Sequence, residues 1–332
     1  MLFLCHLNSE APMATLNQLE AFVTAVSTGT FTGAAADLKM SQPAISDLIR
    51  RLEAELGAKL FQRGARQLIL TAEGEELLPF ARQSVVAARM GASAVRAVQS
   101  LGGGTATFGL LRNAEFYLRT DLARNFHLAH PKVRIRLVGQ NSWETGRDVT
   151  RGQLDAGLVT LPIDDEELDV LPLARDEIVY VTADKRRAQK PPSIVDIAGA
   201  PLVLYDAHYA RTDPARRQLN DRAQLSGVSL EPGIEVEYLT TALSLVAEGF
   251  GDTIVCRSAV ASEVEPRGLR TISMAEPMYD TLALVKRRGM SLSPATREMA
   301  ALAFSALVTH ARSDVGTVEL IPVDGLLERF LG

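Results

Sequence analysis

The chain has 332 residues and a mass of 35.9 kDa, which exceeds one ordinary hydrophobic core and predicts two or more domains. Its 47% hydrophobic and 23% charged content excludes a disordered or collagen-like protein. The net charge of −5 argues against a protein that binds polyanions over its whole surface, but it leaves room for a local DNA-binding module.

The sequence has no run of about 18 apolar residues, so no membrane-spanning helix is expected. The first residues, MLFLCHLNSEAPM, lack a basic stretch and contain Glu10, which does not fit a signal peptide. Two cysteines, Cys5 and Cys256, cannot form a disulfide framework. We therefore expect a cytoplasmic protein with no membrane partner.

Two helices are predicted at the start of the chain. The apolar side chains in 16–26 fall on one helical stripe, and Gly29 follows as a helix stop. Thr30 or Thr32 can cap a second, short helix over 34–38, whose alanines permit close helix packing.

A third helix begins at the cap Ser41, tolerates Pro43 in its first turn and ends at Gly57. Its apolar residues face inward, and the outward face of its first turns carries Gln42, Ser46, Asp47 and Arg50. Such a helix, following a short helix and a tight turn, can enter the major groove, where amides and hydroxyls read base edges. A three-helix core that binds no DNA has the same periodicity.

Two short strands, 60–63 and 67–70, are predicted around Gly64-Ala65-Arg66. They form a basic wing that can reach the DNA backbone or the minor groove. The predicted contacts to double-stranded promoter DNA are Thr32, Ser41, Gln42, Pro43, Ser46, Asp47, Arg50, Arg63 and Arg66.

The segment LNQLEAFVTAVSTGTFTGAAADLKMSQPAISDLIRRLEAELGAKLFQRGARQLILTAEGEELL closely resembles the winged helix-turn-helix of LysR-type transcriptional regulators. The match has no gaps from Leu16 to about Ala81, and FTGAAADL, SQPAISDLIRRLEAELGAKLF and LTAEGEELL occur in the family's order. The resemblance implies a bacterial regulator of transcription rather than an enzyme, with RNA polymerase as a candidate further partner.

The family's pattern also marks departures in this chain. Gly33 and Asp47 stand where the family often carries long basic or polar side chains, and an acid facing phosphates costs affinity unless it accepts from a cytosine amine. The family's usual start predicts Met13 as the native start, with 1–12 as an extension or a misassigned start.

A long helix over 73–101, capped by Thr71, follows the wing. Its seam of apolar and small residues can pair with a second copy or pack on its own chain; it consists of Leu78, Ala81, Val85, Ala88, Ala92, Val95 and Gln99. In the family this linker helix pairs protomers, which implies a homodimer and a homotetramer built as a dimer of dimers. Three glycines at 102–104 then read as a hinge.

After the hinge, short apolar runs alternate with helical segments, which predicts an α/β domain with parallel strands. The expected strands are 106–111, 133–138, 156–159, 178–182, 201–204, 253–255 and 281–285, with a tail strand at 318–321 and a tail helix at 324–331.

The segments GQNSWETGRDVTRGQLDAGLVTLP, YLTTALSLVAEGFGDTIVC and LSPATREMAALAFSAL resemble the family's periplasmic-binding-protein-like (type 2) effector domain of two subdomains. The expected organisation is an extension at 1–12, the winged helix-turn-helix at 13–72, the linker helix at 73–101, the effector domain at 105–312 (subdomain I at 105–174 and 271–312, subdomain II at 175–270) and a C-terminal extension at 313–332.

Ligands of open α/β sheets sit beyond the carboxyl ends of strands and at helix N-termini. This rule predicts effector contacts at Arg112, Asn113, Asn141, Ser142, Thr160, Tyr205, Asp206, His208, Thr240 and Thr241. Arg112 can pair with a carboxylate, which points to an anionic metabolite, or form a surface ion pair. Asn141, Thr240 and Thr241 can equally be plain helix caps.

No metal site or cofactor is predicted, because the histidines lack metal-ligand spacing and no glycine-rich phosphate loop or nucleophile–base motif occurs. The acidic run 164–167 fits a solvated turn. Cys256 fits an inert core thiol. An enzyme or solute-binding protein with a helical appendage, and an architectural DNA-binding protein with a vestigial pocket, are the alternative functions.

Overall fold

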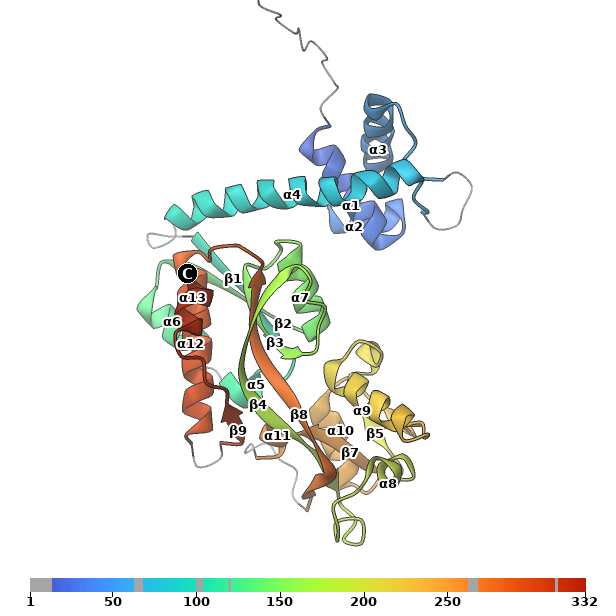
Figure 1. The fold of residues 1–332 in the computed structure, drawn as a ribbon, viewed down its shortest axis with the longest axis vertical. Helices are drawn as coiled ribbons and strands as arrows, with labels where there is room; N and C mark the ends of the chain where they lie inside the picture. The colour runs from blue at the N-terminus through green and yellow to red at the C-terminus, as the bar shows by residue number, and fades with distance from the viewer. Residues whose placement is uncertain (1–13, 63–67, 100–103, 119–120, 262–267, 314–315) are drawn as a thin grey trace, which may run out of the picture. The chain divides into compact units, whose positions relative to one another are not determined.

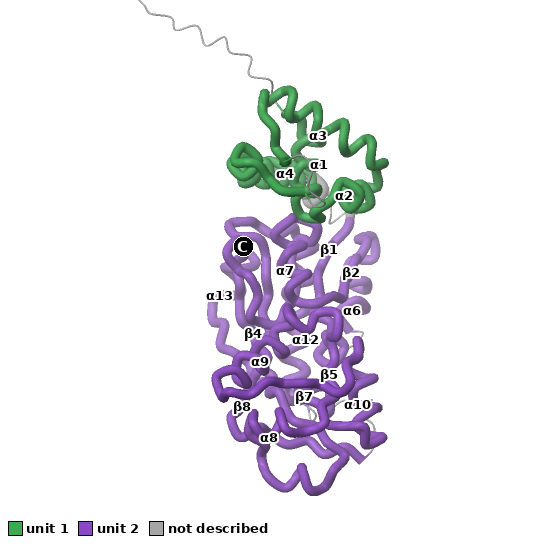
Figure 2. Tube along the Cα trace, turned by 90° about the vertical axis from the view of Figure 1, so that its right-hand side faces the viewer, with its two compact units in different colours: residues 1–94 green, residues 95–332 purple. Residues whose placement is uncertain are grey.

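The structure is a computed structural model that describes residues 14–62, 68–99, 104–118, 121–261, 268–313 and 316–332. The chain divides into two compact units, residues 1–94 and 95–332, which Figure 2 colours separately. The extension predicted at 1–12 and the first two glycines of the predicted hinge lie outside the described residues.

Unit 1 begins with three helices, α1 (Leu16–Thr28), α2 (Phe31–Asp37) and α3 (Gln42–Leu56) (Figure 1). Gly29 (φ 70°) ends α1 and Gly57 (φ 65°) ends α3, both in the left-handed conformation that glycine adopts without steric cost. The three helices and their two glycine stops confirm the sequence-based prediction.

Side-chain caps fix where the second and third helices begin. The hydroxyl of Thr30, not that of Thr32, accepts the N–H of Gly33 at 2.9 Å and caps α2. The hydroxyl of Ser41 accepts the N–H of Ala44 at 3.3 Å and caps α3. Each bond satisfies one of the amides that a helix start leaves without a partner.

The core of unit 1 forms where the three helices meet the segment after α3. The ring of Phe61 lies 5.5 Å from that of Phe22 and 5.6 Å from that of Phe31. Phe61 also forms an antiparallel bridge with Leu70. The predicted wing strands are therefore wrong in extent, because the described residues form one bridge, while 63–67 lie outside them.

Helix α4 (Ala72–Gln99) starts on the core of unit 1. Leu78 and Ala81 of the predicted seam pack there, so its first positions cover their own chain, whereas Ala92 is exposed. Arg89 of α4 donates to Glu20 of α1 at 2.5 Å. Neither α4 nor any other helix within the described ranges is long and apolar enough to cross a membrane.

The main sheet of unit 2 mixes parallel and antiparallel strands. Its strand order is β2 (Val133–Gln140), β1 (Gly104–Leu111), β3 (Ala156–Leu161), β8 (Arg270–Arg287), β4 (Leu168–Thr182) and β7 (Asp252–Cys256). β1 is parallel to β2 and β3, whereas β8 is antiparallel to β3 and β4, and β4 is antiparallel to β7. The expectation of parallel strands is therefore confirmed for β1, β2 and β3 and wrong for β4, β7 and β8, since apolar periodicity carries no information on strand direction.

β4 and β8 are much longer than predicted, at 15 and 18 residues. Proline and charged residues interrupt the apolar pattern of 168–177 and 270–280, which hid these stretches from the periodicity. The pairing shifts register between Pro172 and Ala174 and again between Ile178 and Val179. These irregularities let the two strands bend as they pass through the unit.

The long pair joins two lobes. The first lobe holds β1–β3 with α5 (Glu115–Leu118), α6 (Asp121–Ala129), α7 (Ser142–Thr150) and α12 (Pro294–Ala311). The second lobe holds β5 (Val203–Leu204), β6 (Ile234–Glu235) and β7 with α8 (Ile194–Ala198), η1 (Ala207–Tyr209), α9 (Pro214–Leu225) and α10 (Leu239–Ala247), and α11 (Arg257–Ala261) follows β7.

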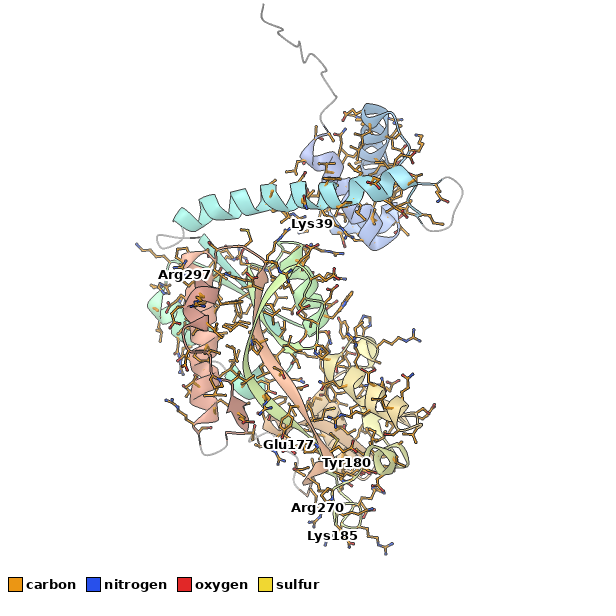
Figure 3. All side chains as sticks on the ribbon, viewed as in Figure 1. Lys39, Glu177, Tyr180, Lys185, Arg270 and Arg297 are labelled. Atoms are coloured by element: carbon orange, nitrogen blue, oxygen red, sulfur yellow. The ribbon has the colours of Figure 1, made fainter. Side chains whose placement is uncertain are left out.

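Both lobes share the two long strands (Figures 1 and 3). Figure 3 marks Glu177 and Tyr180 on β4 and Arg270 at the start of β8. Residues 270–273 of β8 still pair with the end of β4, beside β7. The second crossing between lobes therefore comes later than the predicted boundary at 270/271.

Helices cover both faces of the first lobe's sheet. Val149 of α7 packs with Val159 and Val285 on one face. Phe126 of α6 and Met299 of α12 pack on the other. Alternate strand residues serve the two cores, as the two-residue period of a strand requires.

The C-terminal segment completes unit 2. β9 (Val318–Leu320) pairs with 174–176 of β4, and α13 (Leu326–Leu331) inserts Phe330 into the core with 7% of its surface exposed. The ammonium of Lys286 lies 5.1 Å from the centre of the Phe330 ring. The tail strand and tail helix predicted from the sequence are confirmed.

We expect Phe330→Ala to lower the free energy of unfolding by about 3–5 kcal/mol, because it removes a buried ring and leaves a cavity. Leu326→Ala on the same helix is the control; Leu326 is 47% exposed, and its loss should cost under about 1 kcal/mol. Urea unfolding of the full-length chain measures both. If Phe330→Ala lowered the free energy of unfolding as little as Leu326→Ala, this would contradict a structural role for the tail.

Candidate functional site

The exposed edge of α3 gathers the residues predicted to contact DNA. Ser41, Gln42, Pro43 and Arg50 are exposed and Ser46 is half-buried. The opposite face is occupied by Ile45, Ile49 and Leu52, each at most 3% exposed. The helix is therefore fixed from behind and offers amide, hydroxyl and guanidinium groups outward.

Asp47 is not a free negative charge on this edge. Its carboxylate pairs with Arg50 and lies 2.7 Å from Nε of Arg51. All three side chains remain accessible, so each pair contributes at most about 1 kcal/mol and can exchange for a phosphate. The pairing offsets the repulsion that an acid at this position would otherwise exert on DNA.

The remaining predicted DNA contacts lie beside α3 in the sequence. Thr32 is exposed on α2. The amide N–H of Gln62 donates to the carbonyl of Ile69 at 2.8 Å, next to the Phe61–Leu70 bridge. Arg63 and Arg66 lie outside the described residues.

Unit 2 contains a pocket where the two lobes meet at the long strands. The free space between its lining residues, open solvent included, is about 380 Å³. The lining residues are Leu111, Arg112, Asn113, Tyr117, Asn141, Ser142, Thr160, Tyr205, Asp206, Asp213, Ala215 and Asp280. They come from strand ends, helix starts and the middle of β8, and most of them are polar.

The structure brings most of the predicted effector contacts into this pocket: Arg112, Asn113, Asn141, Ser142, Thr160, Tyr205 and Asp206. Asn141 also caps α7, accepting the N–H of Trp143 at 2.9 Å, so capping and lining are compatible roles. The hydroxyl of Ser142 accepts the N–H of Thr160 at 2.8 Å, which ties the start of α7 to the end of β3.

The other three predicted contacts do not line the pocket. Thr240 and Thr241 lie exposed in the first turn of α10, because Tyr238 occupies the N-cap and the preceding Glu237 is the side chain that reaches inward. His208 is exposed, and its ring packs 4.7 Å from that of Tyr209.

Leu111, at the end of the strand expected over 106–111, also lines the pocket, and four lining residues were not predicted: Tyr117, Asp213, Ala215 and Asp280. Asp213 had a signal, since an acid directly before a proline is a helix N-cap, and it accepts the N–H of Arg216 at 2.8 Å. Asp280 had none, because its part of β8 was not recognised as a strand.

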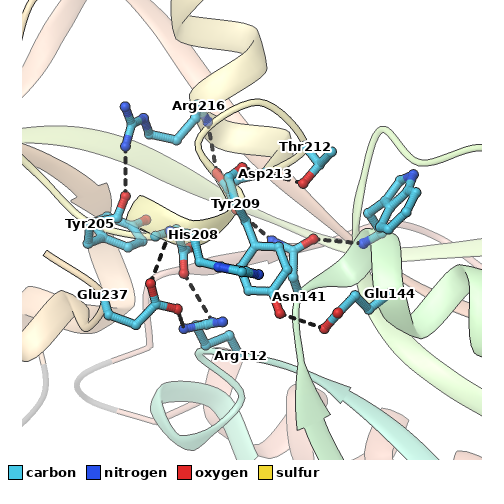
Figure 4. Close-up of polar contacts among 12 residues, drawn as sticks. Arg112, Asn141, Glu144, Tyr205, His208, Tyr209, Thr212, Asp213, Arg216 and Glu237 are labelled. Carbon is cyan, nitrogen blue, oxygen red and sulfur yellow. Dashed lines mark hydrogen bonds and ion pairs between the residues drawn. The ribbon is translucent and has the colours of Figure 1, made fainter. Parts of the chain in front are cut away.

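Side chains connect the lobes around the pocket (Figure 4). Nε of Arg112 lies 3.0 Å from Oδ1 of Asp206, and the same guanidinium pairs with Glu237. Its carbon centre lies 4.9 Å from the centre of the Tyr209 ring. The hydroxyl of Tyr209 donates to Glu144 at 2.8 Å. Arg112 thus forms ion pairs that link the two lobes and does not form an isolated ion pair on the surface.

Two acids of the pocket have raised pKa values. Burial and the neighbouring Asp213 raise the pKa of Asp206 to about 8. Burial, together with Asp213, Asp176 and Asp206, raises the pKa of Asp280 well above its usual range. Asp206 also adopts a left-handed backbone (φ 57°), a conformation that aspartate and asparagine tolerate better than most residues.

Cys256 lies at the end of β7 with 1% of its surface exposed. Burial raises the pKa of its thiol well above the usual range, so the reactive thiolate is disfavoured. Its environment fits the inert core thiol expected from the sequence.

The raised pKa of Asp206 predicts a pH effect on stability. The folded chain binds a proton there that the unfolded chain releases above about pH 4, so this residue lowers the free energy of unfolding as pH rises towards 8, by at most about 1.4 kcal/mol per pH unit. Asp206→Asn, which suits the same backbone, should remove this slope. Urea unfolding from pH 5 to 8, with exposed Asp221→Asn as control, measures it; parallel curves for wild type and Asp206→Asn would refute it.

Comparisons with known proteins cover both units. The family model described as "Bacterial regulatory helix-turn-helix protein, lysR family" matches residues 16–75, and the model described as "LysR substrate binding domain" matches 99–307. The HTH-type transcriptional regulator YvbU of Bacillus subtilis, called uncharacterized, is 27% identical over 82% of this chain and 95% of its own length. The probable hydrogen peroxide-inducible genes activator of Mycobacterium avium is 29% identical, over 87% and 93%.

Solved structures agree with these matches. An OxyR mutant of Corynebacterium glutamicum with hydrogen peroxide bound is 27% identical and aligns over 90% of this chain and 94% of its own, with a TM-score of 0.53. A full-length OxyR variant from Pseudomonas aeruginosa, 22% identical, shares the fold with a TM-score of 0.60 over 92% and 98%. The chain belongs to the LysR family of transcriptional regulators, which are not enzymes, and combines a helix-turn-helix DNA-binding domain with a domain for a small-molecule effector.

Proposed function

We propose that the exposed first turns of α3 read promoter DNA and that the lobe pocket of unit 2 holds the effector. The observation that carries the first assignment is the division of α3 into a buried apolar face and an outward edge of Ser41, Gln42, Ser46 and Arg50. A helix seated in this way can lie in the major groove while its side chains meet base edges.

Each predicted contact has a distinct role in this proposal. Gln42 and Ser46 read bases, because amides and hydroxyls match their hydrogen-bonding edges. Thr32 and Arg50 contact the backbone, with Asp47 orienting the guanidinium of Arg50. Arg63 and Arg66 extend the contact to the wing, a role that the sequence alone supports.

The regulator acts as a dimer, and as a dimer of dimers on separated half-sites, with pairing through the part of α4 beyond Val85. Leu78 and Ala81 belong to the core of unit 1 and Val85 is 4% exposed, so the seam beyond Val85 is what a second copy would cover. It works in the cytoplasm, where promoter DNA and RNA polymerase are its partners.

The position of the pocket couples ligand binding to the arrangement of the two lobes of unit 2. Arg112 and Asn141 belong to the first lobe, and Asp206, Asp213 and Glu237 to the second, so a ligand between them changes how the lobes meet. Bending an operator of about 25 base pairs costs a few kcal/mol, which a ligand with different affinity for two lobe arrangements can supply. The relative's peroxide response does not transfer through Cys256, whose thiol is buried.

We expect Arg50→Ala to weaken binding to the duplex upstream of the chain's own gene by about tenfold, and to lower the salt slope by about one. Gln42→Ala should weaken specific binding while leaving the salt slope unchanged. Arg217→Ala, an exposed arginine on α9, is the control. Fluorescence anisotropy across a salt series measures all three. Unchanged binding in both α3 variants would refute the assignment of the reading helix.

A further inference from the structure

The lining of the pocket is acidic. Of its twelve residues, Asp206, Asp213 and Asp280 carry carboxyl groups and Arg112 is basic. The charge of Arg112 is already compensated by Glu237 outside the lining, and its Nε also lies 3.0 Å from Oδ1 of Asp206. An anionic effector was expected because Arg112 stands at this position, and these two pairs remove that reason.

The neighbouring Arg216 does not restore a positive site. Its side chain is largely buried, and its guanidinium donates to the carbonyl of Tyr205 at 3.0 Å and to Glu235 at 2.8 Å. Both of these contacts stay within the second lobe. Arg216 therefore supports the loop that carries Asp206 and is not among the residues that line the pocket.

Asp280 points to what is missing from the pocket. It is 7% exposed, and its Oδ1 is buried without a hydrogen-bond partner among the described residues. Asp280 is the backbone partner of Asp176 in the antiparallel pairing of β4 with β8, so the strand fixes its position in the pocket. A buried acceptor without a donor costs about 1–3 kcal/mol, which a ligand N–H would recover.

Asp213 and Asp206 form the opposite wall. Oδ1 of Asp213 accepts the N–H of Arg216, and its Oδ2 lies 3.5 Å from the amide nitrogen of Asn141. The charge of Asp213 contributes to the raised pKa of Asp206, as expected for two neighbouring carboxyl groups. Two carboxyls so close favour either a shared proton or a cation between them.

We propose that the effector carries a positively charged nitrogen, an ammonium or guanidinium group, whose N–H groups donate to Asp280 and to the Asp206–Asp213 pair. This inference rests on the proposed function, in which this pocket is the effector site. The paired Arg112 remains as the link between lobes and does not contact the charged nitrogen.

The proposal fixes the sign of a pH dependence. The charged and titratable groups around the acids lie on several elements: Arg112 after β1, Tyr117 on α5, Asp176 on β4, Tyr205 before η1, Arg216 on α9, Glu237 before α10 and Cys256 at the end of β7. A cation binds the deprotonated carboxyls, so its affinity rises with pH, at most about tenfold per pH unit for each proton released, until the free pocket has lost its protons. An anion needs the protonated carboxyls, and its affinity falls over the same range.

The test uses full-length protein and two probes on the same five-carbon chain, the dication 1,5-diaminopentane and the dianion glutarate, together with agmatine as a guanidinium probe. Thermal unfolding and calorimetric titration at pH 6, 7 and 8 report binding, because a ligand of the folded state raises its stability. We expect saturable stabilisation by a cationic probe, stronger at pH 8 than at pH 6, and none by glutarate.

Asp280→Asn keeps the shape of the side chain and removes its charge, and it should lower the affinity for the cationic probe by about tenfold or more. Asp221→Asn, on the exposed face of α9, should change affinity less than about twofold. If the Asp280 variant does not fold, Asp213→Asn serves the same purpose. Stabilisation by glutarate, no stabilisation by either cationic probe, or full cation affinity in both variants would each overturn the proposal.

Measuring DNA binding distinguishes failure of the cationic-effector proposal from failure of the proposed function. If glutarate binds the pocket and changes the affinity for promoter DNA, the effector site stands and the cationic class is wrong. If the α3 variants bind DNA as wild type does, the reading helix is wrong whatever the probes show.

Discussion

The antiparallel pairing of β4 with β8 is the constraint on which unit 2 depends. Fifteen and eighteen residues long, the two strands pass from one lobe to the other and carry the sheet of both. Their register shifts near Pro172 and Ile178 bend the pair where the lobes meet. A sheet joint of this kind holds the lobes together through backbone hydrogen bonds, while side chains decide how they face each other.

The pocket lies at this joint, and its chemistry follows from burial. Asp280 is fixed by the strand, whereas Asp206 and Asp213 are brought in by the loop and helix start of the second lobe. Burying several carboxyls together is unfavourable while all are charged, and this raises the pKa values of Asp206 and Asp280. A site in that condition responds to any ligand that replaces a proton with a positive charge.

Unit 1 depends on a simpler division. Caps at Thr30 and Ser41 start α2 and α3, and Ile45, Ile49 and Leu52 hold α3 against the core. What remains outside is a polar edge whose ion pairs are exposed and weak. Weak pairs suit a DNA-binding surface, because phosphate oxygens can replace Asp47 at little cost.

The sequence by itself determined the features that arise from neighbours along the chain: the helix cap at Ser41, the glycine stops, the apolar stripes and the strand ends after which Arg112, Asn141 and Asp206 line the pocket. Only the tertiary structure decided the direction and length of β4 and β8, the presence of Asp280 in the pocket and the pairing of Arg112 with Asp206 and Glu237. Local signals act over a few residues, whereas these contacts join segments about 100 residues apart. The net charge of the pocket therefore depends on carboxyl groups that only the folded chain brings together.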